Sequence, residues 1–378
     1  MRRSARGAQE PARSTNQLEL TNEISGSSPR PVPTIAGVVN KRQSAIRLLV
    51  YCDPKYRAKA VWRLHPRIVQ SRGVSEVLNV GGESQPELGA SDRWLSWLKT
   101  DRDAGDEEAR RRTMAWLRPV YDRVLHGARL TAGETVLEIG AGEGILGLLA
   151  LDRVGPSGHV VLTDQSDSVI AALQDSLAAG ASDRLDVLPA PVETLAGIDD
   201  ASVDVILSRS VLIYCRDLPA AMTSIARVLR PGGRISAFEP LWQFFDPAAT
   251  PTEFFGRELP NCEAEITAVM AGYRENLRAL LEPPFTTEAL TAAAEAAGFT
   301  SIKATVEAES EPLPVGDDVA VKLALHSKPN PETDSPAEMA TRMLNSAQAA
   351  KFMAAVEQSV RTGRGRSRRA AVYFRAER

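Results

Sequence analysis

The stretch Glu134–Gly144, which reads ETVLEIGAGEG, joins a run of strand-forming residues to three alternating glycines. Apart from Glu138, residues 135–139 are β-branched or apolar, and this composition favours a short buried strand. A helical pattern follows at once, from Ile145 to Leu151. The order of strand, glycine turn and helix is typical of a doubly wound α/β sheet.

The three glycines, Gly140, Gly142 and Gly144, would let the backbone of this turn approach a ligand closely, because glycine has no Cβ. A dinucleotide-binding fingerprint, G-x-G-x-x-G, would need its third glycine at position 145, which is Ile145. The observed pattern is instead E-x-G-x-G-x-G, beginning at Glu138. It resembles motif I of the class I S-adenosylmethionine (SAM) dependent methyltransferases.

The segments after the glycines repeat strand and helix. Residues 159–163 form an apolar run that ends in Asp164, about twenty residues past the glycines, where a carboxylate can accept both ribose hydroxyls. An aspartate after a strand can also be a helix N-cap. Further strands are predicted at 184–188, 202–208, 234–238 and 301–306, with a helix at 218–229.

A second motif, Leu229–Gly233 (LRPGG), precedes the fifth predicted strand about ninety residues after the first motif. It is similar to the turn found at this point in the same family. The resemblance runs from roughly residue 90 to the end and implies a Rossmann-like α/β sheet of seven mostly parallel strands. Its antiparallel last strand would be Ala370–Phe374, inserted between the fifth and sixth strands.

The resemblance also implies SAM as the cofactor. Glu138 would orient the methionine end, whose ammonium needs an anionic partner away from water. No acidic residue stands at the usual adenine position, so backbone groups near Val192, or the Glu193 side chain, would substitute; Glu193 can equally be a solvated loop charge. The positions assigned to cofactor binding are Glu138, Gly140, Ala141, Gly142, Gly144, Asp164, Gln165, Val192, Glu193 and Ser208.

Methyl transfer by SN2 displacement needs an aligned nucleophile and, where that nucleophile carries a proton, a base. Residues after the fourth strand face the methyl group in this fold, which nominates Arg209 and Tyr214 as catalytic residues. Glu239, at the end of the fifth strand, would act as a base or orient the acceptor. Each has a structural alternative: a salt bridge for Arg209, packing for Tyr214 and a cap for Glu239.

The chain divides into three predicted parts. Residues 1–80 carry fourteen Lys or Arg against five Asp or Glu and are expected to be a poorly structured extension, a transit-peptide mimic or a docking arm. Residues 81–130 are expected to form a helical cap whose aromatic side chains favour core packing. Residues 131–378 would be the methyltransferase domain, with an aromatic-rich substrate lid at 241–284.

Composition excludes several other classes. The 378 residues contain no apolar run long enough to cross a membrane, and the three cysteines and four histidines are too dispersed for a disulfide framework or a metal site. These features favour a cytoplasmic location. The net charge of −3, and Ser208–Val211 in place of an N/D-P-P-Y turn, disfavour a nucleic-acid substrate.

The sequence therefore predicts a SAM-dependent methyltransferase that acts on a small-molecule or natural-product acceptor. Two alternatives stay open. A peptide or protein could be the acceptor, with the basic region 1–80 as a docking arm. A catalytically silent SAM-fold binding subunit is the other, although the intact glycine loop and Asp164 count against it.

Overall fold

The computed structural model describes residues 90–177, 182–241, 251–281 and 284–378. The predicted basic extension, 1–80, lies outside these residues, as do three aromatic residues of the expected lid, Trp242, Phe244 and Phe245.

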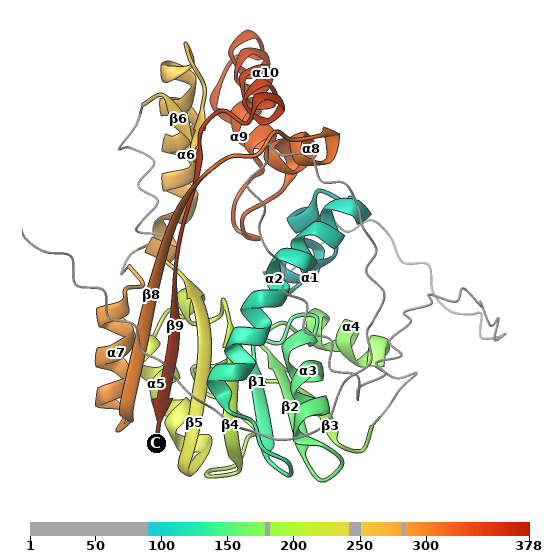
Figure 1. The fold of residues 1–378 in the computed structure, drawn as a ribbon, viewed down its shortest axis with the longest axis vertical. Coiled ribbons are helices and arrows are strands. Elements are labelled where there is room, and N and C mark those ends of the chain that lie inside the picture. The colour runs from blue at the N-terminus through green and yellow to red at the C-terminus, as the bar shows by residue number, and fades with distance from the viewer. Residues whose placement is uncertain (1–89, 178–181, 242–250, 282–283) are drawn as a thin grey trace, which may run out of the picture. The chain divides into compact units, whose positions relative to one another are not determined.

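A seven-stranded sheet, in the order β3-β2-β1-β4-β5-β9-β8, organises the described residues (Figure 1). Strands β1 to β5 are parallel to their neighbours, whereas β9 runs antiparallel between β5 and β8. This arrangement confirms the predicted Rossmann-like α/β class with its inserted antiparallel last strand. The strands are β1 Thr135–Ile139, β2 His159–Asp164, β3 Leu185–Pro189, β4 Val203–Arg209, β5 Leu229–Pro240, β8 Thr300–Pro312 and β9 Arg366–Glu377.

Helices cover both faces of the sheet, because successive strand residues point to opposite sides. Val136 of β1 packs with one group of helices, whereas its neighbour Leu137 packs with the other. The first group is α2 Glu107–Ala128, α3 Ile145–Val154 and α4 Asp167–Leu177; the second is α5 Leu218–Val228 and α7 Thr287–Ala296. The sheet is therefore the central layer of three.

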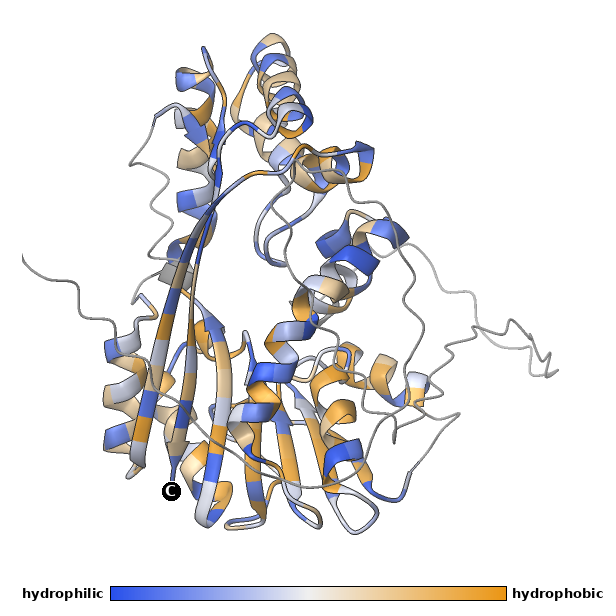
Figure 2. Cartoon of the chain, viewed as in Figure 1, coloured by the Kyte–Doolittle hydropathy of each residue, from blue (hydrophilic) through white to orange (hydrophobic). Residues whose placement is uncertain are grey.

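A separate helical cluster is attached through the long β8–β9 ribbon (Figure 1). Residues 366–370 of β9 pair only with β8, and many residues of this part of the ribbon are hydrophilic (Figure 2). Phe254, Tyr273 and Phe352 pack in the centre of the cluster. Its elements are β6 Glu253–Phe254, β7 Arg257–Glu258, α6 Glu263–Leu281, α8 Asp318–His326, α9 Pro336–Met343 and α10 Ser346–Thr362.

The predicted elements mostly match, with two differences in extent. Leu229–Gly233, predicted as a turn before the fifth strand, belongs to β5, where the pairing with β4 shifts register between Val203 and Val205. β8 continues to Pro312, although the sequence predicted a strand only as far as Val306. No helix within the described ranges is long and apolar enough to cross a membrane.

Candidate functional site

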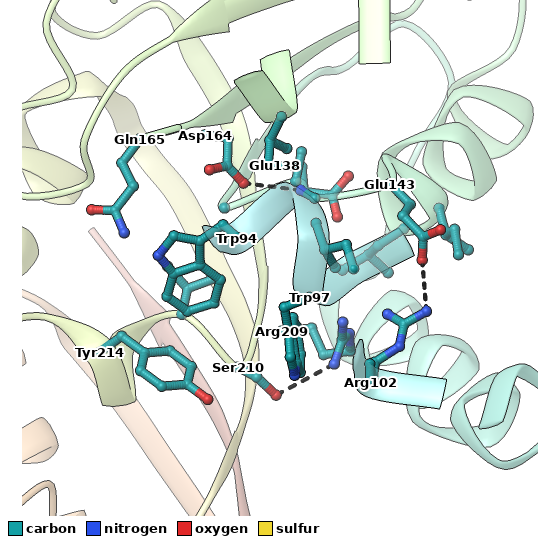
Figure 3. A pocket seen from close by; sticks show the side chains of 18 of the residues that line it. Trp94, Trp97, Arg102, Glu138, Glu143, Asp164, Gln165, Arg209, Ser210 and Tyr214 are labelled. Carbon is teal, nitrogen blue, oxygen red and sulfur yellow. Dashed lines mark hydrogen bonds and ion pairs between the residues drawn. The ribbon is translucent and has the colours of Figure 1, made fainter. Parts of the chain in front are cut away.

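A cavity of about 310 Å³ opens at the carboxyl ends of β1, β2 and β4, where open α/β sheets bind ligands (Figure 3). One side consists of the glycine loop and the residues after β2 and β3: Glu138, Gly140, Ala141, Gly142, Glu143, Asp164, Gln165, Ala190, Val192 and Glu193. The other side comes from the N-terminal helices and the residues after β4: Trp94, Trp97, Leu98, Arg102, Trp116, Leu117, Tyr121, Arg209, Ser210, Val211, Tyr214 and Cys215. We call these the glycine-loop side and the aromatic side.

The glycine loop has a backbone that only glycine adopts easily. Gly140, Gly142 and Gly144 have φ values of 58°, 55° and 71°. A Cβ on Gly140 would lie 3.0 Å from Val211 Cγ1 and closer still to Cγ2. Gly144 caps α3 and packs toward Leu173, so it shapes the loop without lining the cavity.

Asp164 ends β2 and lines the cavity, as the sequence predicted. Its carboxylate accepts the N–H of Gly142 at 3.1 Å and that of Ser166 at 3.0 Å. Burial raises the pKa of Asp164, and the N–H donors oppose that rise. The side chain thus joins the end of β2 to the glycine loop and is fixed in orientation.

Glu138, the acidic residue of β1, is buried and lines the cavity. Its Oε2 accepts the N–H of Gly147 at 2.6 Å, an approach that a Cβ on Gly147 would block. Burial raises the pKa of this carboxyl to about 8, because one N–H donor only partly compensates for lost water. A cation brought into the cavity would relieve this penalty.

The predicted cofactor-binding residues after β2 and β3 also reach the cavity. Val192 is buried, whereas Gln165 is exposed and Glu193 is half-buried. All three line the glycine-loop side, which also includes Ala141. The N–H of Ala190 donates to the Asp164 carbonyl at 3.0 Å and so sets the turn after β3.

Two of the three predicted catalytic residues line the aromatic side. The Arg209 guanidinium lies over the ring of Tyr121, 5.6 Å from its centroid, and its Nη1 is 3.5 Å from Ser210 Oγ. Tyr214 packs edge-to-face against Trp94 at 5.2 Å between centroids. Burial raises the pKa of Tyr214, with a further contribution from Glu239, so its phenol is neutral at ordinary pH.

Glu239, the third predicted catalytic residue, is fully buried behind the cavity lining. Its carboxylate accepts the N–H groups of Val211, Leu212 and Ile213 at 3.1–3.2 Å, and Ser208 Oγ lies 3.4 Å away. These contacts hold the 3₁₀ turn η3, Leu212–Tyr214, against the end of β5. Ser208, which the sequence assigned to cofactor binding, is likewise buried and does not line the cavity.

The N-terminal helices contribute aromatic side chains to the cavity, although the sequence predicted that these side chains would pack in the core. Trp94 and Trp97 of α1, Ala90–Lys99, line the cavity, as does the half-exposed Trp116 of α2. Trp97 Nε1 donates to the Lys328 carbonyl at 2.9 Å, which ties α1 to the loop after α8. Spacing alone could not separate these residues from Val124, which is buried in the core and does not line the cavity.

An ion-pair network joins the N-terminal segment that contains Arg102 and Arg110 to the glycine loop. Glu143, between two of the loop glycines, pairs with Arg102 at 3.1 Å and with Arg110. Both arginines also contact Asp103, in the 3₁₀ turn η1, Asp101–Asp103. Charge complementarity thus connects the two sides of the cavity.

The donor set fits SAM and offers no alternative metal site. The loop leaves room where a Cβ would stand, and Asp164 faces the cavity. Among the described residues, none forms an ion pair with Glu138, whose carboxylate accepts the N–H of Gly147. Within the described ranges, no group of three or more His, Cys, Asp or Glu side chains could hold a metal ion.

Comparison with known proteins agrees with this fit. Residues 137–237 match the family described as Methyltransferase domain. The chain is 32% identical to the arsenite methyltransferase of Halobacterium salinarum over 29% of this chain and 28% of that protein. It is 34% identical to the nocamycin O-methyltransferase of Saccharothrix syringae over 37% of this chain and 49% of that protein. The matched segments thus span less than half of either relative.

Among solved structures, a SAM-dependent methyltransferase from Aquifex aeolicus has 17% identity and a TM-score of 0.35, over 48% of this chain and 79% of that one. The match over residues 137–237 contains the glycine loop, Asp164 and the LRPGG segment. The chain therefore carries a methyltransferase domain of the class I, SAM-dependent family.

Proposed function

We propose that this protein transfers a methyl group from SAM to a small organic acceptor. The observation that carries the proposal is a single cavity whose glycine-loop side fits the cofactor and whose aromatic side remains free for an acceptor. Because both sides line the same space, an acceptor on the aromatic side would be near the methionine end of the cofactor.

On the glycine-loop side, Asp164 would bind the ribose hydroxyls, and the backbone of Gly140–Gly142 would follow the rest of the cofactor. Glu138 would face the cofactor ammonium, which supplies the positive charge that its buried carboxyl lacks. Val192, Glu193 and Gln165 would surround the adenine and ribose. Gly144 and Ser208 would shape this side from behind, since neither lines the cavity.

When bound, the cofactor supplies the activated methyl group, so the residues of this chain have mainly to align the acceptor. Trp94 and Tyr214 would hold its apolar body, and Arg209 would contact its polar end. Glu239 would act as a positioning residue, because its carboxylate holds the turn that presents Tyr214.

A small acceptor is supported by the size of the cavity, about 310 Å³, and by the names of the two relatives, which refer to arsenite and to nocamycin. We also propose a cytoplasmic location, because three widely separated cysteines suit a reducing compartment. The domain division predicted from the sequence, with a cap at 81–130 and a lid at 241–284, is part of the same proposal.

The proposal is tested by titrating the full chain with S-adenosylhomocysteine in a calorimeter, beside Asp164→Ala. The control is Asp175→Ala, which removes an exposed carboxylate from α4. We expect micromolar binding that Asp164→Ala weakens at least tenfold and that Asp175→Ala leaves unchanged. Absence of binding to the wild-type chain would contradict the cofactor assignment and favour a silent scaffold.

The acceptor class is tested separately by following radiolabelled methyl transfer from SAM into small-molecule and peptide pools. Transfer into the small-molecule pool by a chain lacking residues 1–80 would support the proposal. Transfer only into peptides, and only when residues 1–80 are present, would instead identify the basic region as a docking arm.

A further inference from the structure

The aromatic side of the cavity combines flat apolar surfaces with a cation. Trp94 and Trp97 meet edge-to-face at 6.0 Å, and Trp94 meets Tyr214 in the same way at 5.2 Å. Rings arranged in this manner favour flat, conjugated ligands. Arg209 lines the same side, and Figure 3 shows its contact with Ser210 as a dashed line.

The two arginines of the cavity differ in their partners. Arg102 is already paired with Asp103 and Glu143. Arg209 contacts only Ser210 Oγ and the ring of Tyr121, and within the part of the chain that the structure describes it forms no ion pair. Its attraction to Glu138 acts only at longer range. A guanidinium without a paired anion in a partly enclosed site is suited to bind a carboxylate or another oxyanion.

The aromatic side also lacks an effective base. Burial raises the pKa of the Tyr214 phenol and of the Cys215 thiol, so both are neutral at ordinary pH. The charge of Glu193 contributes to the shift at Cys215, which places that carboxylate nearby. A carboxylate is nevertheless too weak a base to ionise an alcohol before transfer. An acceptor that already carries a negative charge would need no base.

We infer that the acceptor is a flat, conjugated molecule with an anionic oxygen, held against Trp94 and Tyr214 with that oxygen directed to Arg209. This inference rests on the proposed function and specifies its substrate class. The acceptor oxygen forms the new O–CH₃ bond as the S–CH₃ bond breaks, the electron pair of that bond stays on sulfur, and no proton is released. Because a sulfonium and an oxyanion neutralise each other in this step, a water-poor aromatic site favours it.

A cationic acceptor is the main competitor, because aromatic rings also attract quaternary ammonium groups. Arg209 would repel such a ligand at close range. Arg209 could alternatively bind the carboxylate of the cofactor itself. The test must therefore separate the charge of the acceptor from the affinity for the cofactor.

The probes are three naphthalenes of similar shape: 2-naphthoate, the neutral 2-naphthalenemethanol and the cationic 2-naphthylmethyl-trimethylammonium. Each is titrated by tryptophan fluorescence into the full chain saturated with S-adenosylhomocysteine. The variants are Arg209→Gln and the matched control Arg216→Gln, which removes an exposed arginine seven positions along. Thermal unfolding and cofactor calorimetry are measured on each protein.

We expect 2-naphthoate to bind the wild-type chain at least tenfold more tightly than either other probe. Arg209→Gln should abolish this preference while S-adenosylhomocysteine affinity changes by less than twofold, and Arg216→Gln should retain the preference. Equal binding of the three probes, or tightest binding of the cation, to the wild-type chain would overturn the inference. A folded Arg209→Gln variant that loses cofactor affinity would also overturn it, by assigning Arg209 to the cofactor.

Failure of the proposed function would appear differently, because the wild-type chain would then not bind S-adenosylhomocysteine at all. Methyl transfer provides a second readout with the same probes. Label incorporated into 2-naphthoate, and not into 2-naphthalenemethanol, would support an oxyanion acceptor. Equal incorporation into the alcohol would require a base in the site and would contradict the inference.

Discussion

The two sides of the cavity are built in different ways. The glycine-loop side consists of backbone and short side chains from the ends of consecutive strands, fixed by N–H donors such as those of Gly142 and Gly147. The aromatic side is assembled from long side chains of α1, α2 and the segment after β4. A common cofactor needs a conserved backbone geometry, whereas different acceptors need only different side chains. The five predictions below test this division.

The largest effect is expected at Gly140. Gly140→Ala introduces a Cβ into the space of Val211 at a φ of 58°, so the loop must move. We expect S-adenosylhomocysteine affinity to fall more than 100-fold by calorimetry. Gly197→Ala is the control, since its φ of 82° carries the same backbone strain, about 1 kcal/mol, while its Cβ meets open space. Equal losses in both variants would show that strain, and not the shape of the loop, controls binding.

Glu239 holds the segment after β4 in place, and its replacement should affect stability more than cofactor binding. Glu239→Gln places an amide NH₂ among three N–H donors, so we expect a loss of about 2 kcal/mol in the free energy of unfolding. The measurement is urea unfolding followed by circular dichroism. A Glu239→Gln variant with the stability and the methyl-transfer kinetics of the wild-type chain would contradict the positioning role.

The same variant tests a pH dependence. Burial raises the folded-state pKa of Glu239 to about 7 from its ordinary value of 4.5, so the folded state binds more protons between these values. The contribution of the protonated Glu239 side chain to the free energy of unfolding is therefore fully present below about pH 4.5 and is lost as the pH rises through about 7. The difference in stability between the wild-type chain and Glu239→Gln should shrink over that window.

Glu138 should couple cofactor binding to proton release. Because burial raises its pKa to about 8, the carboxyl is mostly protonated at pH 7 and must ionise to face an ammonium. We expect affinity for S-adenosylhomocysteine to rise roughly tenfold per pH unit between pH 6 and 8. Calorimetry in buffers of different ionisation enthalpy should detect close to one released proton at pH 7, and none from Glu138→Gln. An identical proton count in the two proteins would contradict this assignment.

Trp94 should give the smallest of these effects, confined to the aromatic side. Trp94→Ala removes ring contacts with Trp97 and Tyr214, and we expect 2-naphthoate affinity to fall about tenfold. Trp116→Ala, at a half-exposed position, should cost threefold or less. Cofactor affinity should change by less than twofold in both. A larger cofactor loss in Trp94→Ala would mean that the two sides are not separable.

The sequence predicted the glycine-loop side well because its signals are local. Glu138, the glycines and Asp164 lie at the ends of strands whose apolar patterns are plain, and adjacent parallel strands bring those ends together. The fold class followed from the same patterns together with the LRPGG segment.

The aromatic side could not be predicted in this way. A tryptophan at helical spacing looks the same whether it faces a core or a cavity, so Trp94 and Trp97 were expected in the core. Conversely, Phe254 and Tyr273 of the expected lid pack with Phe352 in the helical cluster and do not line the cavity. These outcomes depend on contacts between residues far apart in the chain.

The extent of β8 was underestimated for a related reason. Glu307, Glu309 and Glu311 make its second half read as a polar loop. Glu307, however, pairs with Arg123 of α2, and Glu309 and Glu311 lie opposite an arginine-rich part of β9. Arg369 lies within ion-pair distance of both Glu309 and Glu311. Charge pairs between neighbouring strands can therefore stabilise the outer part of a two-stranded ribbon. A search for alternating apolar residues does not detect that part.

The position of β9 has a consequence for how the sheet is formed. Its neighbour β5 ends at Pro240, whereas β9 begins at Arg366, so the whole helical cluster is synthesised between two strands that must pair. Until then the edge of β5 is open to other chains. Such distant pairing slows folding, because a long loop has to close before any contact stabilises it. Formation of the β5–β9 pair should therefore be the late, aggregation-sensitive step in the maturation of this protein.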